Sequence, residues 1–132
     1  MKAVIDTNVL IFDYVENSEF HKEAEELLDY LEGWVIPAIV IHEFIWFLKR
    51  ENLDSHIDDV KAYIRNEKSE IVGETPEIIL DAISILQQRK LSLSHYNDLI
   101  ILSHAVKNNL PLATFDEGLK SECKRLKVKT LP

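Results

Sequence analysis

Residues 3–10 read Ala-Val-Ile-Asp-Thr-Asn-Val-Leu, a short apolar run that ends in a carboxylate and passes at once into a helical pattern. The run Ala3–Ile5 has the length and composition of a buried strand. Further short strand-like runs follow along the chain: Trp34–Ile36, Glu70–Val72, Leu112–Phe115 and Lys127–Thr130. We therefore predict five short strands.

Helical patterns of apolar residues fill the segments between these strands. The predicted helices are Asn8–Tyr14, Ser18–Glu32, Ala38–Arg50, Asp54–Asn66, Pro76–Lys90, His95–Lys107 and Glu117–Leu126. Ser18, Thr75 and Ser94 are capping candidates at three helix starts, and Asn109 before Pro111 marks a helix end. Strands that alternate with helices predict an α/β fold, with a mainly parallel five-stranded sheet and helices on both faces.

The composition fits one folded domain, which we place over residues 1–132. Hydrophobic residues make up 46 % of the chain and charged residues 29 %, the ordinary globular mixture. Three glycines are too few for a dinucleotide fingerprint or a P-loop. Cys123 is the only cysteine, which excludes an internal disulfide and a thiolate metal cluster. We find no export signal and no apolar stretch of about 20 residues, and we expect a cytoplasmic protein without membrane contact.

The net charge of −8 argues at first sight against a nucleic-acid partner. The basic residues are unevenly distributed, however, because residues 120–132 contain five of them and a single acid. Lys124, Arg125 and Lys127 of this run are candidates for RNA binding. The same run could equally be a solvated rim of the sheet.

Most acidic residues fit the solvated face of an amphipathic helix, and Asp81 is an example. Glu43 and Asp98 depart from this pattern, because their neighbours one helical turn away are apolar. A buried carboxylate is costly unless it is protonated, paired or bound to a cation. We therefore single out Glu43 and Asp98.

Asp6 and Asp116 each lie at or just past the carboxyl end of a predicted strand. Ligands bind at that edge of an open α/β sheet, although each aspartate alone could be a helix cap. Together with Glu43 and Asp98 they suggest a cluster whose mutual repulsion calls for a cation. All-oxygen ligands favour Mg²⁺ or Mn²⁺ over zinc, and two such ions can support phosphodiester hydrolysis.

Four segments in this order resemble the PIN domain family of metal-dependent ribonucleases, in particular the VapC-type toxins of prokaryotic toxin–antitoxin pairs. The resemblance spans essentially the whole chain. The segments are Val4–Leu10, Pro37 followed six residues later by Glu43, Tyr96–Ile100, and Ala113–Leu119.

The resemblance implies a role for particular residues. Asp6, Glu43, Asp98 and Asp116 match the acidic quartet that binds Mg²⁺ or Mn²⁺ and activates the attacking water. Asn8 and Thr114 match the polar positions around that quartet. Glu117 is either an additional acid or a charge at a helix N-terminus, where the helix dipole favours it.

The resemblance also implies an activity and partners. The expected reaction is endonucleolytic cleavage of single-stranded RNA. The expected partners are RNA, a cognate antitoxin and a second copy of the chain. The small size and single cysteine favour a toxin, because larger PIN nucleases carry zinc ribbons or accessory domains.

Other functions remain open at the level of sequence. The chain could be a PIN-fold RNA-binding or regulatory module without catalysis. A haloacid-dehalogenase-like phosphatase would need a second aspartate where Asn8 stands. His42-Glu43 fails the zinc-protease motif because Trp46 occupies the position of the second histidine ligand. Trp46 could belong to the core or to an interface.

Overall fold

The computed structural model describes residues 1–132 and contains one sheet of five strands. The strands are β1 (Lys2–Ile5), β2 (Gly33–Pro37), β3 (Ser69–Val72), β4 (Leu112–Ala113) and β5 (Thr130–Leu131). They lie in the order β3-β2-β1-β4-β5, and all neighbouring pairs are parallel. The predicted parallel five-stranded sheet is confirmed.

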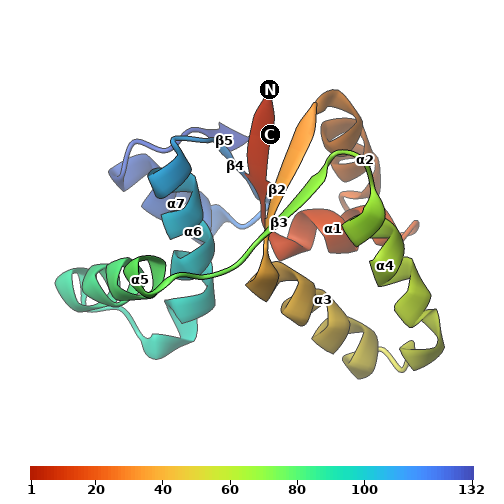
Figure 1. Ribbon diagram of the computed structural model, residues 1–132, viewed down its shortest axis with the longest axis horizontal. Helices are drawn as coiled ribbons and strands as arrows, with labels where there is room; N and C mark the ends of the chain where they lie inside the picture. Colours follow the sequence, from red (N-terminus) through yellow and green to blue (C-terminus); the bar gives the residue numbers. More distant parts are fainter.

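Helices cover both faces of this sheet, as predicted. They are α1 (Thr7–Tyr14), α2 (His21–Tyr30), α3 (Ala38–Arg50), α4 (Ile57–Arg65), α5 (Pro76–Arg89), α6 (Tyr96–Asn108) and α7 (Glu117–Arg125), with short 3₁₀ turns η1 (Asp54–His56) and η2 (Leu93–His95). Helices α1 to α4 lie on one side of the sheet and α5 to α7 on the other (Figure 1). None of these helices has the length and apolar character needed to cross a bilayer.

The hydrophobic core lies between the sheet and these two helical layers. It contains 29 buried apolar residues, including Ala3, Val4 and Ile5 of β1 and Trp34, Val35 and Ile36 of β2. A strand that is buried on both faces reads as a continuous apolar run, which explains why β1 was visible in the sequence. Helix α6 packs against β1 and buries seven consecutive residues from Leu99 to Ala105.

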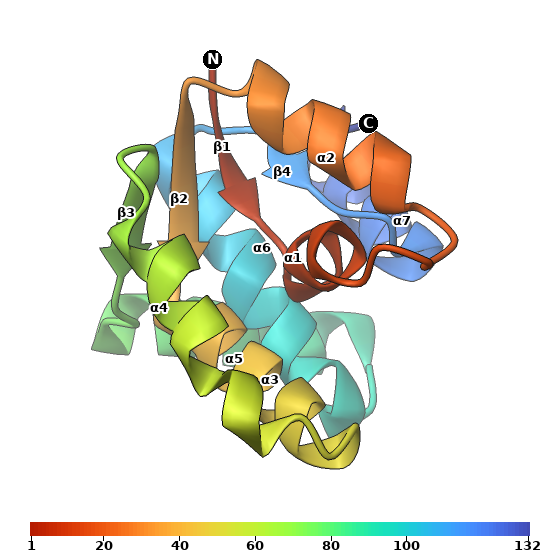
Figure 2. The same ribbon diagram turned by 90° about the vertical axis from the view of Figure 1, so that its right-hand side faces the viewer.

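The strand order reverses between β1 and β4. From the central β1 the chain builds β2 and β3 on one side, and it then crosses to the other side for β4 and β5. The last residues of β1 and β4, Ile5 and Ala113, are register partners. The residues that follow them therefore meet at the carboxyl edge of the sheet, the usual ligand site of such folds. Figure 2 shows α1 continuing directly from the carboxyl end of β1.

Three predicted boundaries are wrong. Helix α2 begins at His21, and the Ser18 hydroxyl donates to the carbonyls of Phe12 and Val15 instead of capping a helix. Ser94 caps nothing, because Ser92 accepts its backbone N–H at the start of η2. Strand β5 begins only at Thr130, since Lys127 has a φ of 58° and turns the chain first. The predicted helix over 54–66 also divides into η1 and α4.

Two other boundaries match the prediction. The Thr75 hydroxyl accepts the backbone N–H of Ile78 at the start of α5, and Pro76 occupies the first turn. Asn109 ends α6 with a φ of 52°, the left-handed conformation that asparagine tolerates. The local chemistry of these residues was sufficient to mark both helix ends.

Candidate active site

Four carboxylates from distant parts of the chain line one pocket of about 430 Å³ at the carboxyl edge of the sheet. Asp6 follows β1, Glu43 lies on α3, Asp98 in the first turn of α6, and Asp116 between β4 and α7. The sequence singled out the same four residues. Their neighbours in the lining are Thr7, Asn8, Ile11, Trp46, Arg50 and Asn97.

Asp6 is the most buried of the four carboxylates, with 5 % of its surface exposed. Its Oδ1 accepts the backbone N–H of Thr7 at 2.7 Å, so that it also caps α1. Its Oδ2 accepts the Thr114 hydroxyl at 2.7 Å and the Asn8 side-chain amide at 3.2 Å. These donors hold the carboxylate at a defined place and compensate part of its desolvation.

Asn8 and Thr114 connect the two strand ends that form the pocket. The Asn8 amide nitrogen reaches Thr114 Oγ1 at 3.4 Å, and its amide oxygen accepts the backbone N–H of Phe115 at 3.1 Å. Thr114 Oγ1 also accepts the backbone N–H of Asp116 at 3.0 Å. The two polar residues that the resemblance pointed to are therefore both in contact with the acidic residues.

Glu43 is oriented by two residues that the sequence analysis did not identify. The Thr7 hydroxyl donates to Oε1, and the Asn97 side-chain amide donates to Oε2 at 3.2 Å. Both residues are direct chain neighbours of a predicted site aspartate, Asp6 and Asp98 respectively. Adjacency was the only signal that could have suggested them, because nothing local indicates that either side chain reaches α3.

Asp98 and Asp116 form the wall between two hollows. Both residues also line a second cavity of about 310 Å³, together with His95, Ser121 and Glu122. Asp116 caps α7 by accepting the backbone N–H of Leu119 at 3.1 Å. The two interpretations of Asp116, a helix cap and a member of the acidic cluster, are therefore compatible.

The electrostatics of the pocket oppose full ionisation of the cluster. Burial raises the pKa of Asp6 to about 7; the Thr114 hydrogen bond opposes that rise, and the charges of Asp98 and Glu43 add to it. Burial, followed by the charges of Asp116 and Glu43, raises the pKa of Asp98 to about 6, while His95 lowers it. Strongly shifted carboxyl groups in a pocket are a common feature of functional sites.

The donor set of this pocket fits a hard divalent cation. It offers carboxylate oxygens, and none of the chain's ion pairs compensates them. No three His, Cys, Asp or Glu side chains converge closely enough to hold an ion as they stand. Protein donors hold Asp6 and Glu43 on both oxygens. The residue types and the charge fit Mg²⁺ or Mn²⁺, and the metal set stays a prediction.

Other predicted site residues lie outside the acidic pocket. Glu117 is largely exposed, pairs with Lys120 at 3.6 Å, and occupies the first turn of α7. Lys124, Arg125 and Lys127 are exposed and are not among the residues that line the pocket. The cation that does line it is Arg50, which the sequence analysis overlooked. Asp81 is exposed on α5, as its helical pattern predicted.

The chain is similar in sequence to a known protein family and in fold to solved structures. The sequence model of the PIN domain family matches residues 3–123. No curated protein sequence matches the chain. A chain of a toxin–antitoxin complex from Klebsiella pneumoniae is 23 % identical, with 86 % of each chain covered and a TM-score of 0.64.

Two further solved structures resemble the chain over nearly its full length. VapC20 of Mycobacterium tuberculosis, described as a sarcin–ricin loop cleaving toxin, is 15 % identical, with 91 % of this chain and 94 % of that chain covered and a TM-score of 0.78. VapBC2 of Rickettsia felis, solved with a DNA fragment from its promoter, is 20 % identical, with 99 % and 98 % covered and a TM-score of 0.71. At these identities the likeness concerns the fold.

Proposed function

The chain belongs to the PIN domain family, and from that premise we propose that it is a Mg²⁺- or Mn²⁺-dependent endoribonuclease acting on single-stranded RNA. Asp6, Glu43, Asp98 and Asp116 are the proposed catalytic and metal-binding residues. We propose further that the protein is the toxin of a toxin–antitoxin pair and works in the cytoplasm.

The observation that carries the proposal is the meeting of four carboxylates at the switch point of the sheet. Two of them have pKa values raised by burial and by their neighbours, so the cluster is electrostatically unfavourable without a positive ligand. Hard divalent cations prefer such oxygen ligands. When bound, a cation of this kind lowers the pKa of a water and neutralises phosphate charge.

The residues of the chain have distinct tasks in this proposal. Asp6 stays fixed because Thr114, Asn8 and the Thr7 backbone hold both of its oxygens. Glu43 keeps its orientation through Thr7 and Asn97. Asp98 and Asp116 are less constrained and face both hollows, where they can accept a proton from an attacking water.

Replacement of single carboxylates by amides tests the enzymatic part of the proposal. We expect Asp98→Asn to abolish Mn²⁺-dependent cleavage of a single-stranded RNA, because the amide keeps the shape and loses the charge. Asp81→Asn is the matched control, since Asp81 is exposed on α5 and is not among the residues that line the pocket. Equal losses in the two variants would contradict the assignment of the acidic cluster.

The toxin–antitoxin part of the proposal is supported by the solved structures that share the fold. The similar chain from Klebsiella pneumoniae belongs to a toxin–antitoxin complex. The similar chain from Rickettsia felis belongs to VapBC2. A short reading frame next to the gene would supply the candidate antitoxin. Its product should bind the chain and suppress cleavage. The proposed homodimer is tested separately by the mass of the protein in solution.

The two rival functions make different predictions in the same assays. A non-catalytic PIN module would bind RNA and leave it intact at every Mn²⁺ concentration. A haloacid-dehalogenase-like phosphatase would hydrolyse small phosphomonoesters and spare RNA. That mechanism requires a nucleophilic aspartate, whereas both oxygens of the buried Asp6 already accept hydrogen bonds.

A further inference from the structure

We infer that Trp46 and Arg50 of α3 form the path by which an unpaired RNA segment enters the acidic pocket, with a base stacked on Trp46 and an adjacent phosphate held by Arg50. The inference rests on the proposed function and adds to it the residues that select single-stranded substrate. Trp46 and Arg50 line the same pocket as the four carboxylates.

Trp46 is exposed in a way that its role in the fold does not explain. Its side chain is 62 % exposed, whereas the chain's other tryptophan, Trp34, is 6 % exposed and donates its indole N–H to the Leu28 carbonyl. Trp46 lies three residues after Glu43, on the same side of α3. The aromatic ring of Trp46 is therefore exposed to solvent within one helical turn of Glu43, a proposed catalytic residue.

Arg50 supplies the positive charge that a phosphate needs on the way to an acidic site. It is the only lysine or arginine in the pocket lining, and it lies one helical turn beyond Trp46. None of the chain's ion pairs uses its guanidinium. A planar guanidinium binds phosphate through two parallel hydrogen bonds. The order along α3 is therefore carboxylate, aromatic ring, cation.

A second hollow next to Trp46 has room for a base. Trp46 also lines a separate, mostly apolar hollow of about 340 Å³ with Ile45, Leu48, Lys49, Asp54 and Ile57. Only an unpaired base can leave its own stack and lie on an aromatic side chain, and such stacking is tolerant of sequence. The pair of Trp46 and Arg50 therefore favours single strands over duplexes.

A protein segment could also cover this face of α3. RNA is the occupant that the contacts favour, because the exposed ring and the unpaired cation share one pocket with the carboxylates, and the apolar hollow on which the ring also borders does not include Arg50. The net charge of the chain is −8, which repels phosphates overall. Phosphates must approach an acidic protein through local positive charge, and Arg50 is the only lysine or arginine that lines the pocket.

The test measures binding of a labelled, unstructured RNA in millimolar Mn²⁺, with Asp98→Asn present in every protein to prevent cleavage. Trp46→Leu should weaken binding by about five- to a hundredfold, because one stacked base is lost while the apolar contact area is largely kept. Trp46→Phe should recover much of the affinity. Binding of a duplex of the same sequence should not depend on position 46.

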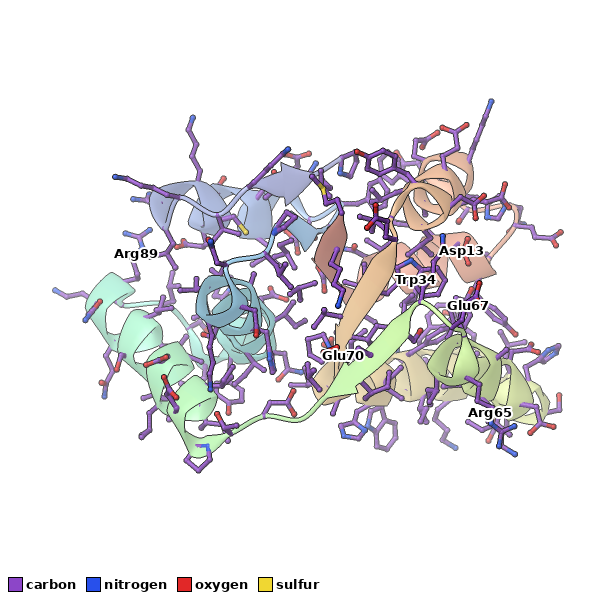
Figure 3. The ribbon with its side chains drawn as sticks, turned by 45° about the horizontal axis from the view of Figure 1, so that its top comes forward. Asp13, Trp34, Arg65, Glu67, Glu70 and Arg89 are labelled. Carbon is purple, nitrogen blue, oxygen red and sulfur yellow. The ribbon has the colours of Figure 1, made fainter.

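Arg50→Gln should weaken RNA binding and reduce the salt dependence of the binding constant by about 0.7 in the log–log slope, as expected for one lost phosphate contact to a single strand. Arg65→Gln is the matched control. Arg65 is exposed on the outer side of α4 (Figure 3) and does not line the pocket, so its replacement should leave the RNA affinity within error.

The same variants in the protein with Asp98 intact separate this inference from the proposed function. Trp46→Leu should raise KM for RNA and leave the Mn²⁺ affinity unchanged. If the unaltered chain cleaves RNA while Trp46→Leu and Arg50→Gln keep normal KM and binding, the inference is wrong and the nuclease assignment stands. Loss of antitoxin binding alone in Trp46→Leu would likewise overturn it. If the unaltered chain neither cleaves nor binds RNA, both the inference and the proposed nuclease function are wrong.

Discussion

Thr114 shows how an uncharged side chain can set the protonation of a carboxylate more than 100 residues away. Its hydroxyl has no exposed surface and donates to Asp6 Oδ2 at 2.7 Å. A hydrogen bond to the charged form of a carboxyl group lowers its pKa, and this contact is the largest influence that opposes the effect of burial on Asp6.

Replacement of Thr114 by valine should therefore raise the pKa of Asp6 further and weaken metal binding. Valine keeps the shape of the side chain and removes the donor. We expect about a 10- to 100-fold loss of Mn²⁺ affinity at pH 7, the range found for residues that orient metal ligands. Calorimetric titration with Mn²⁺ and carboxyl NMR would measure the two effects.

Thr114→Ser distinguishes this effect from general damage. The valine also leaves the backbone N–H of Asp116 without its Thr114 acceptor, at a cost of about 0.5–1.5 kcal/mol of stability. Serine retains both hydrogen-bonding roles and should restore the Mn²⁺ affinity. A serine variant as weak as the valine variant would show that the methyl contact, and not the hydroxyl, is what matters.

Helix α5 begins with a side-chain cap followed by proline. Thr75 accepts the Ile78 backbone N–H at 3.2 Å with Pro76 directly after it. Thr75→Ala should destabilise the protein by about 1 kcal/mol, because one N–H at the helix start loses its acceptor. Urea denaturation would show this as a lower midpoint with an unchanged slope.

Ser94→Ala serves as the control for this cap. Ser94 precedes α6 in the sequence much as Thr75 precedes α5, but its side chain caps nothing and only donates to the exposed Ser92 hydroxyl at 3.1 Å. We expect a change within about 0.5 kcal/mol for this surface substitution. A loss equal to that of Thr75→Ala would contradict the conclusion that the Ser94 side chain caps no helix.

Helices α1 and α4 are joined by two tyrosine–carboxylate hydrogen bonds. The Tyr14 hydroxyl donates to Asp59 at 2.7 Å, and the Tyr63 hydroxyl donates to Asp13 at 2.6 Å. Figure 3 shows Asp13 on the side of the molecule that carries these two helices. These contacts give Asp13 of α1 and Asp59 of α4 a role in joining the two helices, and neither residue lines the acidic pocket.

For the molecule as a whole, the acidic pocket predicts an unusual dependence of stability on pH. The pKa of Asp6 is about 7 in the folded chain and near 3.8 in the unfolded chain, so the folded state binds more protons between these values. The free energy of unfolding without divalent metal should then fall as pH rises from 5 to 7, by up to about 1.4 kcal/mol per pH unit from this group.

The comparison with Asp6→Asn isolates this contribution. The variant lacks the titrating group, and its stability advantage over the unaltered chain in chelator should grow from pH 5 to pH 7. His104 contributes a slope of opposite sign because burial lowers its pKa, but it is present in both proteins and cancels in the difference. Millimolar Mn²⁺ should stabilise only the unaltered chain, and more at pH 7 than at pH 5. If the free energies of unfolding of the two proteins in chelator change in parallel with pH, the prediction is wrong.

Much of this whole-molecule arrangement could be predicted from local patterns. Helix α3 has the predicted bounds, and the other helices and the first four strands were located within a few residues. Strand β5 was misplaced because a run of Lys127 to Thr130 has the alternation of a strand, whereas the left-handed backbone of Lys127 delays the pairing. That conformation ends α7, where the backbone N–H groups of Lys127 and Val128 donate to the carbonyls of Lys124 and Cys123, and a lysine gives no local signal for it.

The sequence by itself determined the fold class and the four unusual carboxylates, because an apolar run that ends in an acid, and an acid on an apolar helix face, are patterns within one or two turns of chain. Only the tertiary structure decided how these acids are held and approached. The contact of Thr7 with Glu43 spans 36 residues, and that of Thr114 with Asp6 spans 108. The pocket is lined by Arg50, which lies on α3 with Glu43, and not by the basic run of Lys124, Arg125 and Lys127. Which separate elements meet at the edge of a parallel sheet depends on strand order, which no local pattern encodes.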